Sequence, residues 1–336
     1  MHAFLSPPIS VSTAHAFAAF FSFSYVGSLY LSKSARLKFD KNAKPKSESE
    51  ERERRNDERW RNDPDVIKAR LLAASVSTTL SVCAVFWLVK SLIPEADIAA
   101  DPSAPLQTGL ARLGLTFTIA QDNPFAIILP CLVAPVLYFG PLYAEFLSEE
   151  LPFQRNFSFA THIKPTFFSW VGLRNHAIGP ITEEIVFRAC VLSVYHLSGA
   201  STMKMIFLSP LAFGVAHLHH AWDTYNRYGR TRSALRVAGV QTLFQLAYTS
   251  LFGFHCAYLF LRTGSLLPPT LSHMFCNVMG LPQYGTHVAK FPSRKLAVQA
   301  AYLAGVAGYV YAMRAWTGAD ASVYWGVVGP DGAGRY

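Results

Sequence analysis

Two carboxylates and a guanidinium open an otherwise apolar helix in the stretch Ile181-Thr182-Glu183-Glu184-Ile185-Val186-Phe187-Arg188. Pro180 just before it suits a first helical turn, and Thr182 suits a helix cap that acidic residues follow. Glu184 and Arg188 stand four residues apart, so we expect them to pair on one face of the helix. Glu183 points about 100° away from that face. It has no partner within the helix.

An unpaired charge at the edge of a hydrocarbon layer is costly. Each such residue costs on the order of 2–3 kcal/mol or more, so charged residues in membrane helices are functional candidates. Glu183 is therefore the first candidate of this chain. The alternative reading of the stretch is an interfacial ion pair that anchors a helix end.

The composition places the chain among polytopic membrane proteins. It has 336 residues, of which 51% are hydrophobic and 15% charged, whereas soluble proteins carry about 25% charged residues. The charge is also clustered, because 13 of the 30 Lys and Arg residues lie in 33–70. The net charge of +9 fits a positive-inside bias better than a nucleic-acid surface, since no basic face is interleaved with aromatic residues. We expect no nucleic-acid partner.

The five cysteines lie in apolar stretches at unrelated spacings, which argues against a disulfide framework or a zinc cluster. Apolar runs predict an all-α fold of about eight membrane spans, at 9–31, 71–92, 124–147, 180–197, 203–217, 237–261, 266–281 and 296–316, with 167–177 leading into the fourth. Residues 106–116 are too short to span and predict an interfacial helix. We expect one membrane-embedded domain over 1–336, with its catalytic core in 170–282.

Segment 33–70 has almost no apolar residues before Val66, so we expect a partly disordered or helical cytosolic loop. Placing it in the cytosol puts the basic loops 219–236 and 282–295 there too, as the positive-inside rule asks. Glu183 and His217 then occupy the cytosol-facing halves of their helices, and His273 lies near mid-membrane.

Three further polar residues interrupt apolar helices: His217, and the pair His273 and Asn277, which share one helix face. Within a bilayer such groups must converge on one another or on water. A carboxylate with a histidine can hold and deprotonate a water molecule. A second histidine and an amide are suitable donors to an oxyanion. The set predicts hydrolysis of an amide by activated water, with Glu184 and Arg188 keeping Glu183 oriented.

These motifs occur in an order that resembles the type II CAAX prenyl endopeptidases, the Ras-converting-enzyme family of glutamate-dependent intramembrane proteases. The resemblance covers about 170–282 and is to the eukaryotic branch. It rests on Leu173-Arg174-Asn175, on E-E-x-x-x-R at Glu183 to Arg188, on F-x-x-x-H at Phe213 to His217, on Phe260 to Leu266, and on H-x-x-x-N at His273 to Asn277.

The resemblance implies an enzyme that cleaves after the prenylated cysteine of a C-terminal Cys-a-a-X sequence and releases a tripeptide. It implies catalysis by Glu183 and His217, which activate water, and by His273 and Asn277, which form the oxyanion site. His219 and His220 also match, although a loop role at the membrane surface fits them equally. It further implies no cofactor, substrates such as Ras-like small GTPases, and the endoplasmic reticulum membrane, with the site facing the cytosol.

Two other readings stay open at the level of sequence. Glu183, His217 and His273 could form a three-ligand zinc shell, and activity that survives chelation would remove this reading. A non-catalytic scaffold or transporter could use the polar residues as a proton or substrate path. No inverted repeat is evident, which counts against a transporter, and full function in a Glu183→Gln protein would favour this class.

Overall fold

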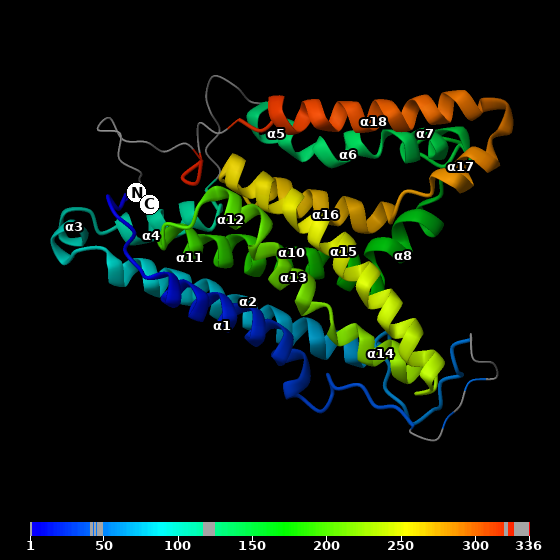
Figure 1. The fold of residues 1–336 in the computed structure, drawn as a ribbon, viewed down its shortest axis with the longest axis horizontal. Coiled ribbons are helices and arrows are strands. Elements are labelled where there is room, and N and C mark those ends of the chain that lie inside the picture. Colours follow the sequence, from blue (N-terminus) through cyan, green and yellow to red (C-terminus); the bar gives the residue numbers. More distant parts are fainter. Residues whose placement is uncertain are drawn as a thin grey trace. The chain divides into compact units, whose positions relative to one another are not determined.

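The computed structural model describes residues 2–40, 43, 45, 50–116, 125–318, 322–325 and 336. In this part of the chain every regular element is a helix, and the isolated β-bridge joins Lys38 and Arg59 (Figure 1). The all-α prediction is confirmed. The expected third span starts at position 124, outside the described residues, and is compared with the structure from residue 125 on.

The chain divides into two compact units. Unit 1 consists of Met1–Gly109, Ile185–Ala257 and Gly334–Tyr336, and unit 2 of Leu110–Glu184 and Tyr258–Ala333. Glu183, Glu184, His273 and Asn277 belong to unit 2, whereas Arg188 and His217 belong to unit 1. The single protease domain expected from sequence stays a prediction.

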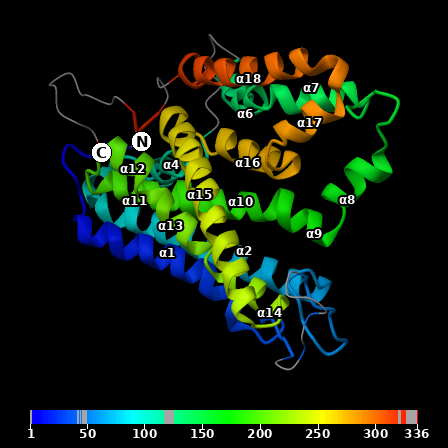
Figure 2. The ribbon, with the colours of Figure 1, turned by 45° about the vertical axis from the view of Figure 1, so that its right-hand side comes forward.

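Unit 1 is built on two long helices that lie side by side, α1 (Val11–Leu31) and α2 (Pro64–Leu92) (Figures 1 and 2). Ser10 caps α1 by accepting a hydrogen bond from the backbone N–H of Thr13, and Pro64 opens α2 at the position where its missing N–H costs nothing. The other helices are α3 (Glu95–Ala100), η3 (Ile185–Cys190), α11 (Val191–Leu197), α12 (Thr202–Phe207), α13 (Ser209–Ala216) and α14 (His219–Arg227).

Unit 2 places α18 (Lys295–Ala315) along α6 (Val133–Leu137) and α7 (Phe139–Leu147), as both ribbon views show (Figures 1 and 2). Its other helices are α5 (Phe125–Cys131), η1 (Phe159–Ile163), α8 (Lys164–Phe167), α9 (Trp170–Leu173), η2 (Arg174–Ile178), α10 (Gly179–Glu184), α16 (Leu267–Met279), α17 (Tyr284–Lys290) and η4 (Pro292–Arg294). Two helices run from one unit into the other, α4 (Ala104–Arg112) and α15 (Arg232–Thr263).

Three described helices are long and apolar enough to cross a membrane: Val11–Leu31, Pro64–Leu92 and Pro292–Ala315. They correspond to the first, second and last of the expected spans. The membrane character is supported, and the count of eight spans stays a prediction. The expected third span is broken into α5, α6 and α7 at Leu132 and Tyr138, in a stretch that contains Pro130, Pro135 and Pro141.

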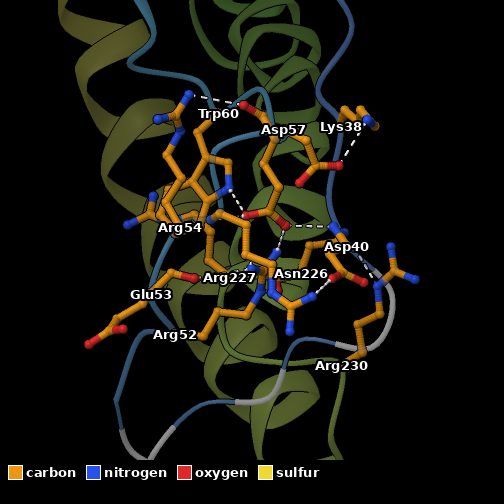
Figure 3. Close-up of polar contacts among 12 residues, drawn as sticks. Lys38, Asp40, Arg52, Glu53, Arg54, Asp57, Trp60, Asn226, Arg227 and Arg230 are labelled. Atoms are coloured by element: carbon orange, nitrogen blue, oxygen red, sulfur yellow. Dashed lines mark hydrogen bonds and ion pairs between the residues drawn. The ribbon is translucent and has the colours of Figure 1, made fainter.

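The charged segment 33–70, expected to be a partly disordered or helical cytosolic loop, makes specific contacts in its described residues. Glu51 and Arg52 contact α14, and Figure 3 shows polar side chains around Arg52. The Arg52 side chain donates to the backbone carbonyl of Asn226 at 3.0 Å, and its guanidinium pairs with Glu58 at 2.5 Å. Both side chains of this pair are almost completely buried, at 1% and 0% exposed. An apolar core is not required here, because paired and hydrogen-bonded charges can be buried.

Candidate active site

The helix that carries both glutamates is short and lies between two π-helical segments. α10 follows η2 and precedes η3, and both flanking segments are π-helices. Thr182 does not cap α10, because its hydroxyl donates to the carbonyls of Ile178 and Gly179 at 2.9 and 3.0 Å, inside the helix. That part of the sequence prediction was wrong. Single π-helical turns often mark functional sites, and nothing in the sequence pattern indicated them.

His273 on α16 contacts both glutamates of α10. Its Nδ1 atom lies 2.7 Å from Oε1 of Glu184, and its Nε2 atom lies 3.7 Å from Oε2 of Glu183. Glu184 is fully buried, whereas 24% of the Glu183 side chain is exposed. One carboxylate thus holds the imidazole ring at Nδ1, and the other lies on the side of Nε2 and is partly exposed.

This arrangement fixes the proton of the imidazole. An ionised Glu184 can only accept a hydrogen bond, so Nδ1 of His273 carries a hydrogen and donates it. The distance of 3.7 Å from Nε2 to Glu183 is too long for a hydrogen bond. Nε2 therefore makes no hydrogen bond to Glu183 in this structure, and a ring that is protonated on both nitrogens could donate from Nε2.

Asn277 lies one helical turn after His273, as predicted, and its amide is anchored. Its Nδ2 atom donates to the backbone carbonyl of Asn175 at 2.8 Å, and Arg174 holds the Asn175 side chain by a bond of 2.9 Å from Nε to Oδ1. An amide nitrogen has two hydrogens, so the bond to Asn175 uses one of them. The Leu173-Arg174-Asn175 motif thereby positions Asn277, a role that the sequence did not reveal.

The position of α16 follows from its two ends. Pro268 and Pro269 lie in its first turn, where prolines are tolerated, and Gly280 ends it with a φ of 65°. The Tyr138 hydroxyl donates to the Gly280 carbonyl at 2.9 Å, and the Tyr138 ring meets Phe275 edge-on at 5.4 Å. These contacts fix the helix that carries His273 and Asn277.

His217 in unit 1 follows α13 and has its own fixed orientation. Its Nδ1 atom lies 2.8 Å from the Phe213 carbonyl. A carbonyl only accepts, so Nδ1 carries the hydrogen of the neutral ring and leaves the lone pair on Nε2. Phe213 also supports Arg188, whose Cζ atom lies 4.4 Å from the ring centroid. The F-x-x-x-H motif thus joins His217 and Arg188 within unit 1.

The histidines after His217 are neutral at pH 7. Burial, together with the nearby Arg61 and Arg70, lowers the pKa of His219 to about 4. Burial and the same arginines also lower the pKa of His220 well below its usual value. The three histidines form one cluster, in which the ring centroids of His219 and His220 are 4.0 Å apart and those of His217 and His220 5.7 Å.

Comparisons with known proteins agree with these motifs. The type II CAAX prenyl endopeptidase Rce1-like family model matches residues 165–279. A Schizosaccharomyces pombe protein named probable CAAX prenyl protease 2 is 34% identical over 66% of this chain and 70% of its own length. The Arabidopsis thaliana CAAX prenyl protease 2 is 32% identical over 74% of this chain and 81% of its own length. The Homo sapiens protein of the same name is 34% identical over 77% and 68%.

The chain belongs to this family. The recognition and the enzyme class that the sequence predicted are confirmed: this is a CAAX prenyl endopeptidase. The matched range contains Glu183, His217, His273 and Asn277. No solved structure gives a significant match.

The structure of this CAAX endopeptidase also bears on the zinc reading. Among the described residues, no three His, Cys, Asp or Glu side chains form a group that could hold a metal ion. The zinc reading names Glu183 and His273, which belong to unit 2, and His217, which belongs to unit 1. The zinc reading is tested by chelation below.

The structure brings together four predicted residues of the CAAX endopeptidase in unit 2 and two, Arg188 and His217, in unit 1. Sequence reasoning missed the contact between Glu184 and His273, which stand 89 positions apart. The expected pair of Glu184 and Arg188 stays a prediction. It assumed α-helical spacing, which ends at Glu184 because η3 is a π-helix.

Proposed function

We propose that this CAAX endopeptidase removes the C-terminal aaX tripeptide of prenylated CaaX proteins, using water activated by Glu183 and His217. The observation that carries the proposal is the contact of one buried imidazole, His273, with two carboxylates. The partly exposed Glu183 lies 3.7 Å from Nε2 of His273, so a base and an imidazole that can donate when protonated lie side by side. The names of the relatives, CAAX prenyl protease 2, supply the substrate class.

The proposed reaction has two stages. In the first, the water oxygen bonds to the carbon of the scissile carbonyl, and the water proton passes to Glu183 or to the lone pair on Nε2 of His217. The carbonyl oxygen becomes an oxyanion and accepts hydrogen bonds from Nε2 of His273 and Nδ2 of Asn277. In the second, the C–N bond breaks, the proton moves to the leaving nitrogen, and the tripeptide departs.

The same proposal covers substrates and location. Ras-like small GTPases that end in a prenylated CaaX sequence are the expected substrates, because the prenyl chain can enter the bilayer in which the apolar helices of this chain lie. We expect a multi-pass protein of the endoplasmic reticulum membrane with its site open to the cytosol, supported by the basic loops 219–236 and 282–295. A fluorescent fusion and protease protection in sealed microsomes test both statements.

The decisive experiment measures tripeptide release from a farnesylated Cys-a-a-X peptide. Membranes that carry the wild type are compared with Glu183→Ala and Glu183→Gln, each with and without a chelator. Glu95→Gln is the matched control, because Glu95 is an exposed carboxylate in the first turn of α3.

Cleavage by the wild type and by the Glu95→Gln control, but by neither Glu183 variant, supports the proposal if the chelator has no effect. Chelator-sensitive cleavage would instead move Glu183, His217 and His273 into a metal shell. Equal cleavage by the wild type and both Glu183 variants would remove Glu183 from the mechanism. No cleavage by the wild type would leave the scaffold or transporter reading.

A further inference from the structure

The loop 148–157, which follows α7 in unit 2, presents one aromatic side chain entirely to its surroundings. Phe153 has a relative exposure of 105%, and its backbone φ of 71° lies in the left-handed region. For a bulky residue a positive φ is a genuine exception, because the Cβ atom crowds the backbone. Such strain is often retained at functional positions. The ring does not offset the strain by packing within the described part of unit 2, because it is fully exposed.

Hydrogen bonds hold the loop 148–157 in one shape. Its backbone closes on itself where the N–H of Asn156 donates to the Glu149 carbonyl at 2.8 Å. The Gln154 side chain makes two further bonds. Its Oε1 atom accepts from the Leu151 N–H at 2.9 Å, and its Nε2 atom donates to the Phe146 carbonyl on α7 at 3.2 Å. The exposed ring directly precedes Gln154, so it is fastened beside the last turn of α7.

The last turn of α7 lies where α18 begins. Both ribbon views show α7 along α18 (Figures 1 and 2). A Cβ atom at Gly140 would lie 2.4 Å from the Tyr302 ring, and one at Gly305 would lie 2.8 Å from the Leu137 carbonyl. The contact positions rise along one segment as they fall along the other, so the two segments are antiparallel. The C-terminal end of α7 therefore meets the N-terminal end of α18.

This junction is also where an apolar stretch long enough to cross a membrane begins, at Pro292–Ala315. Lys290, two positions before it, donates from Nζ to Oγ of Ser148 at 2.7 Å, and Ser148 is the first residue of the loop. Exposed apolar side chains lie at this level on both helices, Phe146 on α7 and Leu296 on α18. The boundary of the candidate span thus passes through the base of the loop 148–157.

The charges near the exposed ring suit a membrane–water boundary. Arg155, two residues after Phe153, is exposed and forms no ion pair in the described part of the chain. Glu149 is exposed as well, so the ring and not the net charge supplies the main attraction. Burying a phenylalanine side chain in an apolar environment is favoured about 10- to 100-fold over leaving it in water. An apolar ring beside a cation is typical of segments that lie in the lipid headgroup region.

We propose that the loop 148–157 is a lipid-binding anchor. Phe153 inserts into the boundary between headgroups and acyl chains of the bilayer, and Arg155 contacts lipid phosphates. The anchor fixes the depth at which α7 and α18 lie in the membrane. The inference goes beyond the proposed function and does not depend on it, because contact with lipid involves no step of peptide cleavage.

The test places the photoreactive residue p-benzoylphenylalanine at position 153 of the full-length protein in phosphatidylcholine–phosphatidylserine vesicles. The native side chain is fully exposed there, so a larger aromatic ring fits without repacking. Irradiation joins the probe to a nearby C–H group, and mass spectrometry identifies the adduct. The same probe at Leu296 is the positive control. The probe at Asn56, exposed in a turn of the polar segment 33–70, is the negative control.

We expect lipid adducts from position 153 to match those from position 296 and to exceed those from position 56 about tenfold or more. The adducts from position 153 should lie on the upper acyl chain, and those from a probe at position 155 on the headgroup or glycerol. The matched variant is Phe153→Gly, since glycine adopts a φ of 71° without strain and the loop keeps its shape. In this background the lipid adducts from position 155 should fall about tenfold.

Four outcomes would overturn the inference. Lipid adducts at position 296 with none at position 153 would place the loop in water. Equal yields at positions 153 and 56 would show that contact with lipid does not depend on the loop. Unchanged adducts from position 155 in Phe153→Gly would show that the ring is not the anchor. Adducts from position 153 on an added farnesylated Cys-a-a-X protein, in place of lipid, would assign the surface to the substrate.

Discussion

The Nδ1 atom of His273 lies 2.7 Å from the Oε1 atom of Glu184, and both side chains are buried. This contact links α10 to α16 across 89 positions of the sequence. It gives Glu184 a partner other than the predicted Arg188, and it settles which nitrogen of His273 faces Glu183. The second glutamate of the E-E-x-x-x-R motif, Glu184, thus contacts the histidine of the H-x-x-x-N motif, His273.

Replacing Glu184 by Gln tests this contact. The amide oxygen can still accept from Nδ1, but a neutral group no longer stabilises the protonated ring that donates from Nε2. We expect kcat to fall about 10²- to 10³-fold, the usual cost of losing one oxyanion donor, with KM nearly the same. Steady-state cleavage of a farnesylated peptide measures both. A Glu184→Gln enzyme within twofold of the wild type would show that the contact only supports the fold, and Glu95→Gln controls for general loss of charge.

Replacing Asn277 by Ala tests the oxyanion role of the amide. We expect kcat to fall about 10²- to 10³-fold for the same reason. Asn156→Ala is a closely matched control, because its Nδ2 atom also donates to a backbone carbonyl, that of Ser148, at 2.8 Å. If both variants lost activity equally, the effect of Asn277 would lie in anchoring the backbone. Combining Asn277→Ala with His273→Ala should cost less than the sum of the single effects, since both donors serve one oxyanion.

The pair of Arg52 and Glu58 should contribute strongly to the stability of unit 1. Arg52→Met leaves Glu58 buried without its cation, and breaking a buried pair in this way costs about 3–5 kcal/mol. Arg54→Met, at an exposed pair with Asp63, should cost less than about 1 kcal/mol. Thermal unfolding in detergent compares the two. Adding Glu58→Leu to Arg52→Met should restore part of the loss, and no restoration would mean that the charge of Glu58 is not the cause.

The same pair predicts how unit 1 responds to acid. Burial alone would raise the pKa of Glu58, but hydrogen bonds from Arg52 and from the backbone N–H groups of Arg55 and Asp40 outweigh it and lower the pKa to about 2. A lowered carboxyl pKa stabilises the folded state above the unfolded pKa of about 4.5. That stabilisation is lost as the pH falls through about 2.

Hydrogen exchange of residues 50–60 measures this loss. The wild type should lose protection between about pH 4.5 and about pH 2, and Glu58→Gln should lack this transition. His219, whose pKa burial lowers to about 4, adds a separate loss of stability between about pH 6.5 and 4 in both proteins. The difference between the two proteins therefore isolates Glu58. Identical profiles of protection against pH in the wild type and Glu58→Gln would contradict the assignment of this transition to Glu58.

Local patterns in the sequence predicted much of the site, because an ionisable residue in an apolar run is conspicuous wherever it lies. This criterion selects Glu183, His217, His273 and Asn277. For segment 33–70 the same reasoning predicted a partly disordered or helical loop and named no contacts. Burial of Arg52 and Glu58 depends on α14, more than 160 positions away, and local composition carries no information about it.

The sequence by itself determined the membrane class, the helical architecture and the family, since each follows from composition, apolar run length or the order of short motifs. Only the tertiary structure decided the hydrogen-bond partners of the site side chains. Distances between helices that are remote in sequence decide which nitrogen of His273 contacts Glu184. They also decide which backbone carbonyl accepts the hydrogen bond from Asn277. The physical reason is that hydrogen bonds act over about 3 Å, so they are set by packing.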